Sequence, residues 1–129
     1  MENPTVKMLE IREVEDVIVV GFLHAKILDE VAIAQIGDEF QSLTMQAAAD
    51  RKLLLNLEKI EFMASAMIAQ IIKLHKLCAK DKITLRLCCI SPNIAEVFKI
   101  TGLNRLLDIY PTELKAMQAF APFRRSRRK

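Results

Sequence analysis

Residues 52–74, KLLLNLEKIEFMASAMIAQIIKL, decide the fold of this chain. Their first part, Lys52–Leu57, is a short apolar run between polar residues, which is typical of a buried strand. Glu58–Glu61 predicts a turn, after which Phe62-Met63 is expected to re-enter the core. From Ala64 to Lys80 the apolar residues recur at helical spacing, so this segment predicts an amphipathic helix. A strand, a turn and a helix in this order indicate an α/β fold.

Similar elements precede this stretch. Val6–Val14 and Asp16–Phe22 predict two strands joined by a tight polar turn, and the second strand is apolar enough to lie inside a sheet. A loop is expected at Leu23–Leu28. Asp29 is a suitable N-cap because its carboxylate can accept hydrogen bonds from free backbone N–H groups, and it precedes a predicted helix over Glu30–Leu43.

The C-terminal part continues the alternation of strands and helices. Ser91 followed by Pro92 is a good start signal for a helix, and Gly102 fits a helix C-terminus because glycine adopts positive φ without penalty. Leu114 is counted among the packing residues of the last helix. The predicted elements are a strand at Ile83–Cys89, a helix over Ile94–Thr101, a strand at Leu106–Tyr110 and a helix over Thr112–Phe120.

The predicted order is therefore ββαβαβαβα. Such an order requires an α/β fold with a central mixed sheet of roughly four to five strands and about four helices, connected by right-handed crossovers. All of these elements lie within residues 1–121, which we expect to form one domain.

The charge of the chain is concentrated at its C-terminus. The formal net charge is +3, but five of the 19 basic residues lie in the last six positions, so the rest of the chain is weakly acidic. Residues 122–129 are expected to form a basic, disordered tail. A basic tail can contact nucleic acid, but no aromatic stacking residues accompany it, so the sequence does not favour nucleic-acid binding.

The sequence lacks the common catalytic and cofactor motifs. It has no glycine-rich phosphate loop and no nucleophile elbow, and His24 and His75 are not spaced as metal ligands with the three cysteines. We therefore expect no catalytic residues, no metal site, no cofactor and no enzymatic activity. The longest apolar stretch, Phe62–Ile72, is about half the length that spans a bilayer, and the first residues do not resemble a signal peptide. These features predict a soluble, cytoplasmic protein that does not bind membranes.

Several strings of residues, in this order and spacing, resemble the STAS domain, a family named after sulfate transporters and anti-sigma factor antagonists. The resemblance covers nearly all of the chain except the tail. The strings are Val19–Leu23, Leu54–Ala69, Leu85–Pro92, and Val97–Leu103 followed by Leu107–Ile109.

The resemblance implies a protein-interaction module that binds an anti-sigma factor with serine-kinase activity, or another STAS protein. In regulated members of the family the kinase phosphorylates the second hydroxyl residue of an Asp-Ser-Ser/Thr motif at the start of a helix. Here that motif is Ala64-Ser65-Ala66, so the position of the phospho-acceptor is occupied by Ala66 and cannot accept phosphate. Met67 stands where the motif has its first glycine, and is expected to offer a bulky, adaptable side chain. Asn56 stands where the family usually has an aspartate.

Two interpretations of the altered motif remain open. The domain binds its partner constitutively, or its regulation uses another hydroxyl: Ser65, Ser42 or Thr44. A phosphate at Ser65 would be stabilised by a helix N-terminus, whereas without phosphate Ser65 would serve as an N-cap. By this resemblance the partner-binding residues are Leu23, His24, Ala25, Lys26, Ala64, Ser65, Ala66, Met67 and Gln70.

Other functions also remain as alternatives. The domain could be a scaffold subunit of a larger STAS-containing assembly, including a homodimer, or it could bind a small ligand or nucleotide near the helix start, where free N–H groups attract anions.

Overall fold

The computed structural model describes residues 7–46 and 51–120, so the predicted tail at 122–129 lies outside the described residues. Strands and helices alternate as the sequence predicts. The elements are β1 (Leu9–Val14), β2 (Val17–Phe22), β3 (Lys26–Ile27), α1 (Glu30–Gln46), β4 (Lys52–Asn56), β5 (Phe62–Met63), α2 (Ser65–Asp81), β6 (Thr84–Cys88), α3 (Pro92–Thr101), α4 (Leu103–Leu106), β7 (Ile109–Tyr110) and α5 (Glu113–Phe120).

The main sheet is mixed, as predicted, and has five strands in the order β1-β2-β4-β6-β7. β1 and β2 form the expected antiparallel hairpin, while β2, β4, β6 and β7 are parallel to one another. β2 therefore lies inside the sheet, and β1 forms one of its edges. The turn of the hairpin holds Glu15 at a φ of 57°, which is uncommon for a residue other than glycine.

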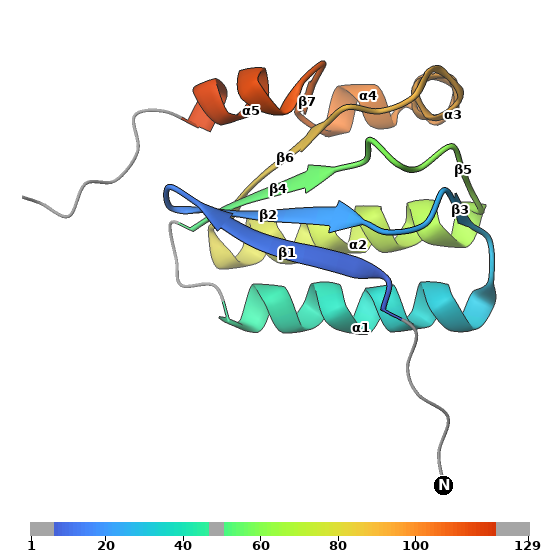
Figure 1. Cartoon of the computed structure of the whole chain (residues 1–129), viewed down its shortest axis with the longest axis horizontal. Coiled ribbons are helices and arrows are strands. Elements are labelled where there is room, and N and C mark those ends of the chain that lie inside the picture. The colour runs from blue at the N-terminus through green and yellow to red at the C-terminus, as the bar shows by residue number, and fades with distance from the viewer. Residues whose placement is uncertain (1–6, 47–50, 121–129) are drawn as a thin grey trace, which may run out of the picture.

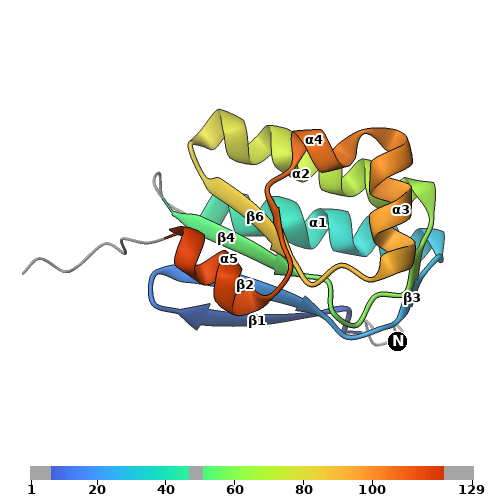
Figure 2. The same cartoon turned by 90° about the horizontal axis from the view of Figure 1, so that it is seen from above.

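Helices cover both faces of the sheet (Figures 1 and 2). On one face α1 and α2 enclose the larger core, in which the Phe22 and Phe40 rings meet edge to face with centroids 6.3 Å apart. On the other face the short helix α5 covers a smaller cluster. Its buried members are Val17, Val19, Leu54, Cys88, Ala116 and Phe120.

Local capping explains where several helices begin. The Asp29 carboxylate accepts a hydrogen bond from the backbone N–H of Ala32 at 2.9 Å, as expected for an N-cap. Ser91 caps α3 through the N–H of Ile94, and Gly102 ends that helix at a φ of 81°. Thr112 accepts from the N–H of Lys115 at the start of α5.

Several boundaries and one packing assignment differ from the prediction. α1 continues to Gln46, one turn beyond the expected end, and α3 begins at Pro92. The strand predicted at Leu106–Tyr110 is shorter, because the chain forms α4 after Gly102 and pairs with β6 only at Ile109–Tyr110. Leu114 is 67% exposed, because the inner face of α5 is formed by residues spaced four apart, Ala116 and Phe120.

Candidate functional site

A small second sheet joins the two segments that the sequence analysis assigned to partner binding. The expected loop after β2 contains β3, which pairs in parallel with β5 so that Lys26 lies opposite Phe62 and Ile27 opposite Met63. Further backbone hydrogen bonds run from the N–H of Glu61 to the carbonyl of Ala25 (2.7 Å) and from the N–H of Ala64 to that of Ile27 (2.9 Å). The chain after β2 and the start of α2 therefore form one continuous surface.

The side chains of these two strands alternate between the core and solvent. Ile27 is 1% exposed and Met63 is half-buried, whereas Lys26 and Phe62 point outward, with the Lys26 Nζ 6.0 Å from the centre of the Phe62 ring. Phe62 is 46% exposed, so the expectation that it re-enters the core is wrong. Because its partner strand has only two residues, no periodicity in the sequence revealed this pairing.

The start of α2 is exposed and has no side-chain cap. Ala64 is the N-cap, with φ −73° and ψ 159°, and its carbonyl accepts the N–H of Met67 at 2.9 Å. Ser65 is the first helical residue, which corrects its interpretation as an N-cap serine. Both Ser65 and Ala66 are exposed, so the position that carries the hydroxyl in regulated members is accessible but lacks an acceptor oxygen.

Two of the predicted binding residues have structural roles instead. Met67 is fully buried in the larger core, which contradicts the expectation that it presents a bulky side chain to a partner. Gln70 is half-buried against α1, where a methyl group added to Gly37 would lie 2.5 Å from the Gln70 Oε1. Gln70 therefore fills the space that a glycine leaves between α1 and α2, and its contribution to a docking surface is small.

Leu23 and His24 bind the segment before β3 to the backbone that precedes β1. The N–H of Leu23 donates to the carbonyl of Met8 at 3.0 Å, and the Nε2 N–H of half-buried His24 donates to the carbonyl of Lys7 at 3.0 Å. These contacts tie the segment before β3 to the start of β1. They hold Ala25 and Lys26, which are exposed, in a fixed position.

Two exposed apolar residues that the sequence patterns do not indicate lie beside this surface. Leu28 follows β3 directly and is 54% exposed, and Val31 in the first turn of α1 is 75% exposed. Helical spacing alone does not distinguish the first turn of the inner face of α1 from its margin, so the sequence does not indicate that Val31 is exposed. We use the term docking surface for the exposed residues of this predicted partner-binding region and their exposed neighbours: Ala25, Lys26, Leu28, Val31, Phe62, Ser65 and Ala66.

Asn56, which stands where the family usually has an aspartate, belongs to a separate polar cluster on the α5 side of the sheet. Its Nδ2 donates to the Glu113 Oε1 at 2.7 Å, and its Oδ1 accepts the N–H of Glu58 at 2.9 Å. The Arg12 Nη2 donates to the same Glu113 oxygen at 2.8 Å. Partial burial would raise the pKa of Glu113, but the hydrogen bonds from Asn56 and Arg12 outweigh it, so this pKa lies below its ordinary value.

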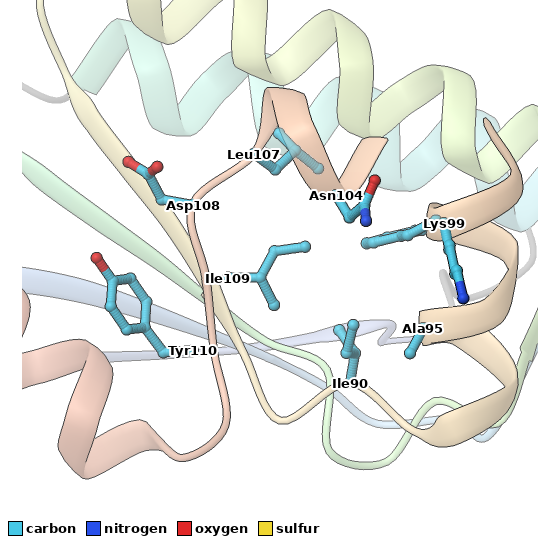
Figure 3. Close-up of a pocket in the computed structure, with 9 residues that line it drawn as sticks. Ile90, Ala95, Lys99, Asn104, Leu107, Asp108, Ile109 and Tyr110 are labelled. Atoms are coloured by element: carbon cyan, nitrogen blue, oxygen red, sulfur yellow. The ribbon is translucent and has the colours of Figure 1, made fainter. Parts of the chain in front are cut away.

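An open hollow lies elsewhere, between α3, α4 and β7 (Figure 3). It measures about 550 Å³ and is open to solvent. Ile90 and Ile109 form its apolar floor, with Lys99, Asn104 and Asp108 around it. None of the predicted site residues lines it, so it gives no support to a small-ligand site at the start of α2.

The cysteines are mainly packing residues. Cys78 and Cys88 are buried, and burial raises the pKa of Cys78 to about 12 and that of Cys88 further still. The Sγ of Cys89 lies 3.3 Å from that of Cys88, because Cys89 leaves the strand with a φ of 65°. The two sulfur atoms therefore lie together, although neighbouring residues within a strand point to opposite faces.

Within residues 7–46 and 51–120, no cluster of His, Cys, Asp or Glu is arranged to hold a metal ion. In the same described part of the chain, no helix is both long and apolar enough to cross a membrane.

Comparison with known proteins identifies the family. A family model described as the STAS domain matches residues 3–116, so this chain belongs to the STAS domain family, as the residue strings indicated. Among curated proteins the comparison found no significant match.

Solved structures agree with this assignment. An anti-sigma factor antagonist (STAS) domain protein from Planctomyces limnophilus is 28% identical, with a TM-score of 0.80 over 88% of this chain and 97% of that one. The anti-sigma factor antagonist SpoIIAA shares the fold in its unphosphorylated form, at 19% identity and a TM-score of 0.74 over 91% of this chain and 99% of that one. The phosphorylated Bacillus SpoIIAA is 20% identical, with a TM-score of 0.66 over 86% and 97% of the two chains. As a STAS domain that resembles anti-sigma factor antagonists, the chain is broadly a protein-interaction module.

Proposed function

We propose that this chain is a non-enzymatic binding module of the anti-sigma factor antagonist type, whose docking surface engages an anti-sigma factor with a serine-kinase fold or another STAS protein. The observation that carries the proposal is the β3–β5 pairing. It places Lys26 and Phe62 side by side, next to the uncapped start of α2.

The chemistry of this surface suits a protein partner. Exposed Leu28, Val31 and Phe62 offer apolar area, and large aromatic side chains contribute strongly to interfaces when a partner buries them. Lys26 adds one positive charge beside the Phe62 ring, which favours a partner with an acidic residue opposite it.

We further propose that binding through this surface is not regulated by phosphorylation at position 66. The exposed methyl group of Ala66 cannot accept phosphate, so the switch of the regulated members is missing at this position. Of the other hydroxyls, Thr44 is 3% exposed and donates to the carbonyl of Gln41 at 2.8 Å, which hides it from a kinase. Ser42 is exposed near the far end of α1, so Ser65 is the hydroxyl left at the helix start.

Affinity capture from the native lysate tests the binding proposal. The wild-type chain should recover a protein with a kinase fold or a second STAS protein, and Phe62→Ala should lose it. Leu114→Ala is the matched control, since Leu114 is also exposed but lies on α5, and it should retain the partner. Recovery of neither class of protein, or equal recovery by both variants, would contradict the proposal.

Intact-mass analysis with the recovered kinase tests the regulatory part. Wild-type protein should gain no phosphate, whereas Ala66→Ser should gain one. This substitution should fold normally, because residue 66 is exposed in the first turn of α2. A phosphate on the wild type that Ser65→Ala removes would show that Ser65 has replaced the usual acceptor.

A further inference from the structure

The outer edge of β1 is unpaired in the described part of the chain. β1 is the first strand of the main sheet and pairs only with β2 (Figure 2). Its residue Ile11 is 49% exposed, although it points to the same side of the sheet as buried Leu9. An exposed edge strand is a template for pairing with another chain.

The hydrogen bonds of the hairpin establish which residues face this free edge. Met8 accepts a hydrogen bond from Leu23, which lies directly opposite it when the β1–β2 register is extended by one residue. In an antiparallel ladder, hydrogen-bonded and non-hydrogen-bonded pairs alternate, so Glu10 and Arg12 also direct their backbone N–H and C=O groups toward β2. Leu9, Ile11 and Glu13 direct theirs outward.

We propose that two copies of this chain pair antiparallel through β1, with Ile11 opposite Ile11 of the second copy. Leu9 then lies opposite Glu13 of the second copy, so all the outward-facing residues of β1 enter the ladder. The two exposed isoleucines meet across the two-fold axis and shield each other from water.

The charges of β1 favour this register over the two neighbouring ones, which are centred on Glu10 and on Arg12. With Ile11 at the centre, each Glu10 lies opposite Arg12 of the second copy. In the register centred on Glu10, the Glu10 side chains of the two copies face each other. In the register centred on Arg12, the two Arg12 side chains face each other. Opposite charges on directly facing residues stabilise a strand pair, and like charges destabilise it.

The side chains concerned are free to make these contacts. Arg12 bonds to Glu113 at 2.8 Å, but its side chain remains 46% exposed and a guanidinium has five N–H donors. Charged side chains often protect edge strands from association, but the charges of β1 have both signs and are self-complementary in this register. None of the docking-surface residues lies on β1, so this proposal does not depend on the proposed function.

Charge-reversal variants test the register by sedimentation velocity over a wide range of protein concentration. The wild type should dimerise, and Glu10→Arg and Arg12→Glu should each weaken self-association by roughly tenfold, because facing charges become alike. An equal mixture of the two single variants should form a heterodimer, and the double variant Glu10→Arg/Arg12→Glu should recover the homodimer. The double variant also lacks the Arg12–Glu113 bond, so its recovery separates charge pairing from loss of that bond.

Ile11→Lys should abolish the dimer, while Ile100→Lys, at an isoleucine that is 75% exposed on α3, should not. Hydrogen exchange gives an independent signature, since raising the concentration should slow exchange at the amides of Leu9, Ile11 and Glu13 and leave Glu10 and Arg12 unchanged. A wild type that stays monomeric at every concentration overturns the proposal. So does a dimer that tolerates both single charge reversals.

Discussion

Replacing Asn56 with aspartate, the residue common at this position in the family, should destabilise this chain. The Asn56 amide now donates to the Glu113 carboxylate at 2.7 Å. An aspartate at position 56 has no N–H group to donate and places a second negative charge beside the Glu113 carboxylate. Arg12 then remains as the side chain with a described hydrogen bond to this oxygen. A hydrogen bond to a charged group contributes about 1.5–3 kcal/mol, and partial exposure of Glu113 reduces the added repulsion. We expect a loss of about 2 kcal/mol in the free energy of unfolding at neutral pH.

Urea denaturation at several pH values measures this loss and its cause. The repulsion raises the pKa of one of the two facing carboxyls in the folded Asn56→Asp variant, so its penalty is full above that pKa and shrinks as the pH falls and a proton binds. In the wild type the pKa of Glu113 is lowered, so its contribution is present above the unfolded-state pKa and is lost as the pH falls through the folded-state pKa. Both effects bring the two proteins closer in stability in acid.

A second substitution separates this explanation from a general intolerance of aspartate. In Asn56→Asp/Glu113→Gln the amide at position 113 can donate to the carboxylate at position 56, so this variant should recover most of the lost stability. Glu113→Gln alone should not stabilise the chain. If Asn56→Asp is as stable as the wild type at neutral pH, or if its penalty does not depend on pH, the Asn56–Glu113 pair does not have the role assigned to it.

Three further predictions follow from the packing. A maleimide should modify Cys89 before Cys78 and Cys88 at neutral pH, as peptide mass mapping can determine, because the latter two are buried with raised pKa values and form little thiolate. Gly37→Val should lower the free energy of unfolding in urea by about 1–3 kcal/mol, since its side chain would enter the contact between α1 and α2. Ser91→Ala should cost about 1 kcal/mol in the same assay through loss of the α3 N-cap.

The main sheet could be predicted because its signals are local and repeated. β2 and β4 are short apolar runs, and Asp29, Ser91 and Gly102 are side chains or backbone conformations that begin or end helices. Each of these signals depends on residues within one turn or one strand of each other. The family resemblance then added the predicted position of the partner-binding segments.

The second sheet could not be predicted in the same way. β3 and β5 have two residues each, and only their mutual pairing makes either a strand. The same reason explains the error at Phe62, which is apolar and follows a turn but faces outward because Met63 occupies the inner position. Likewise, the burial of Met67 depends on how α2 is rotated against the sheet, and residue type alone does not determine that rotation.

The absence of a hydroxyl at position 66 bears on how the proposed binding through the docking surface would be controlled. Phosphorylation of an acceptor would control each domain separately, whereas binding that cannot be modified at Ala66 would depend on how many copies are held together. Pairing through β1 would place two docking surfaces in one assembly without covering either, since β1 contributes no residue to them. A partner with two binding sites would then be held by avidity, and its affinity would fall when β1 pairing is broken, even with both docking surfaces intact. Binding of Ile11→Lys and Phe62→Ala to a bivalent and to a monovalent partner distinguishes loss of avidity from loss of the docking surface. Ile11→Lys should weaken binding only to the bivalent partner, whereas Phe62→Ala should weaken binding to both.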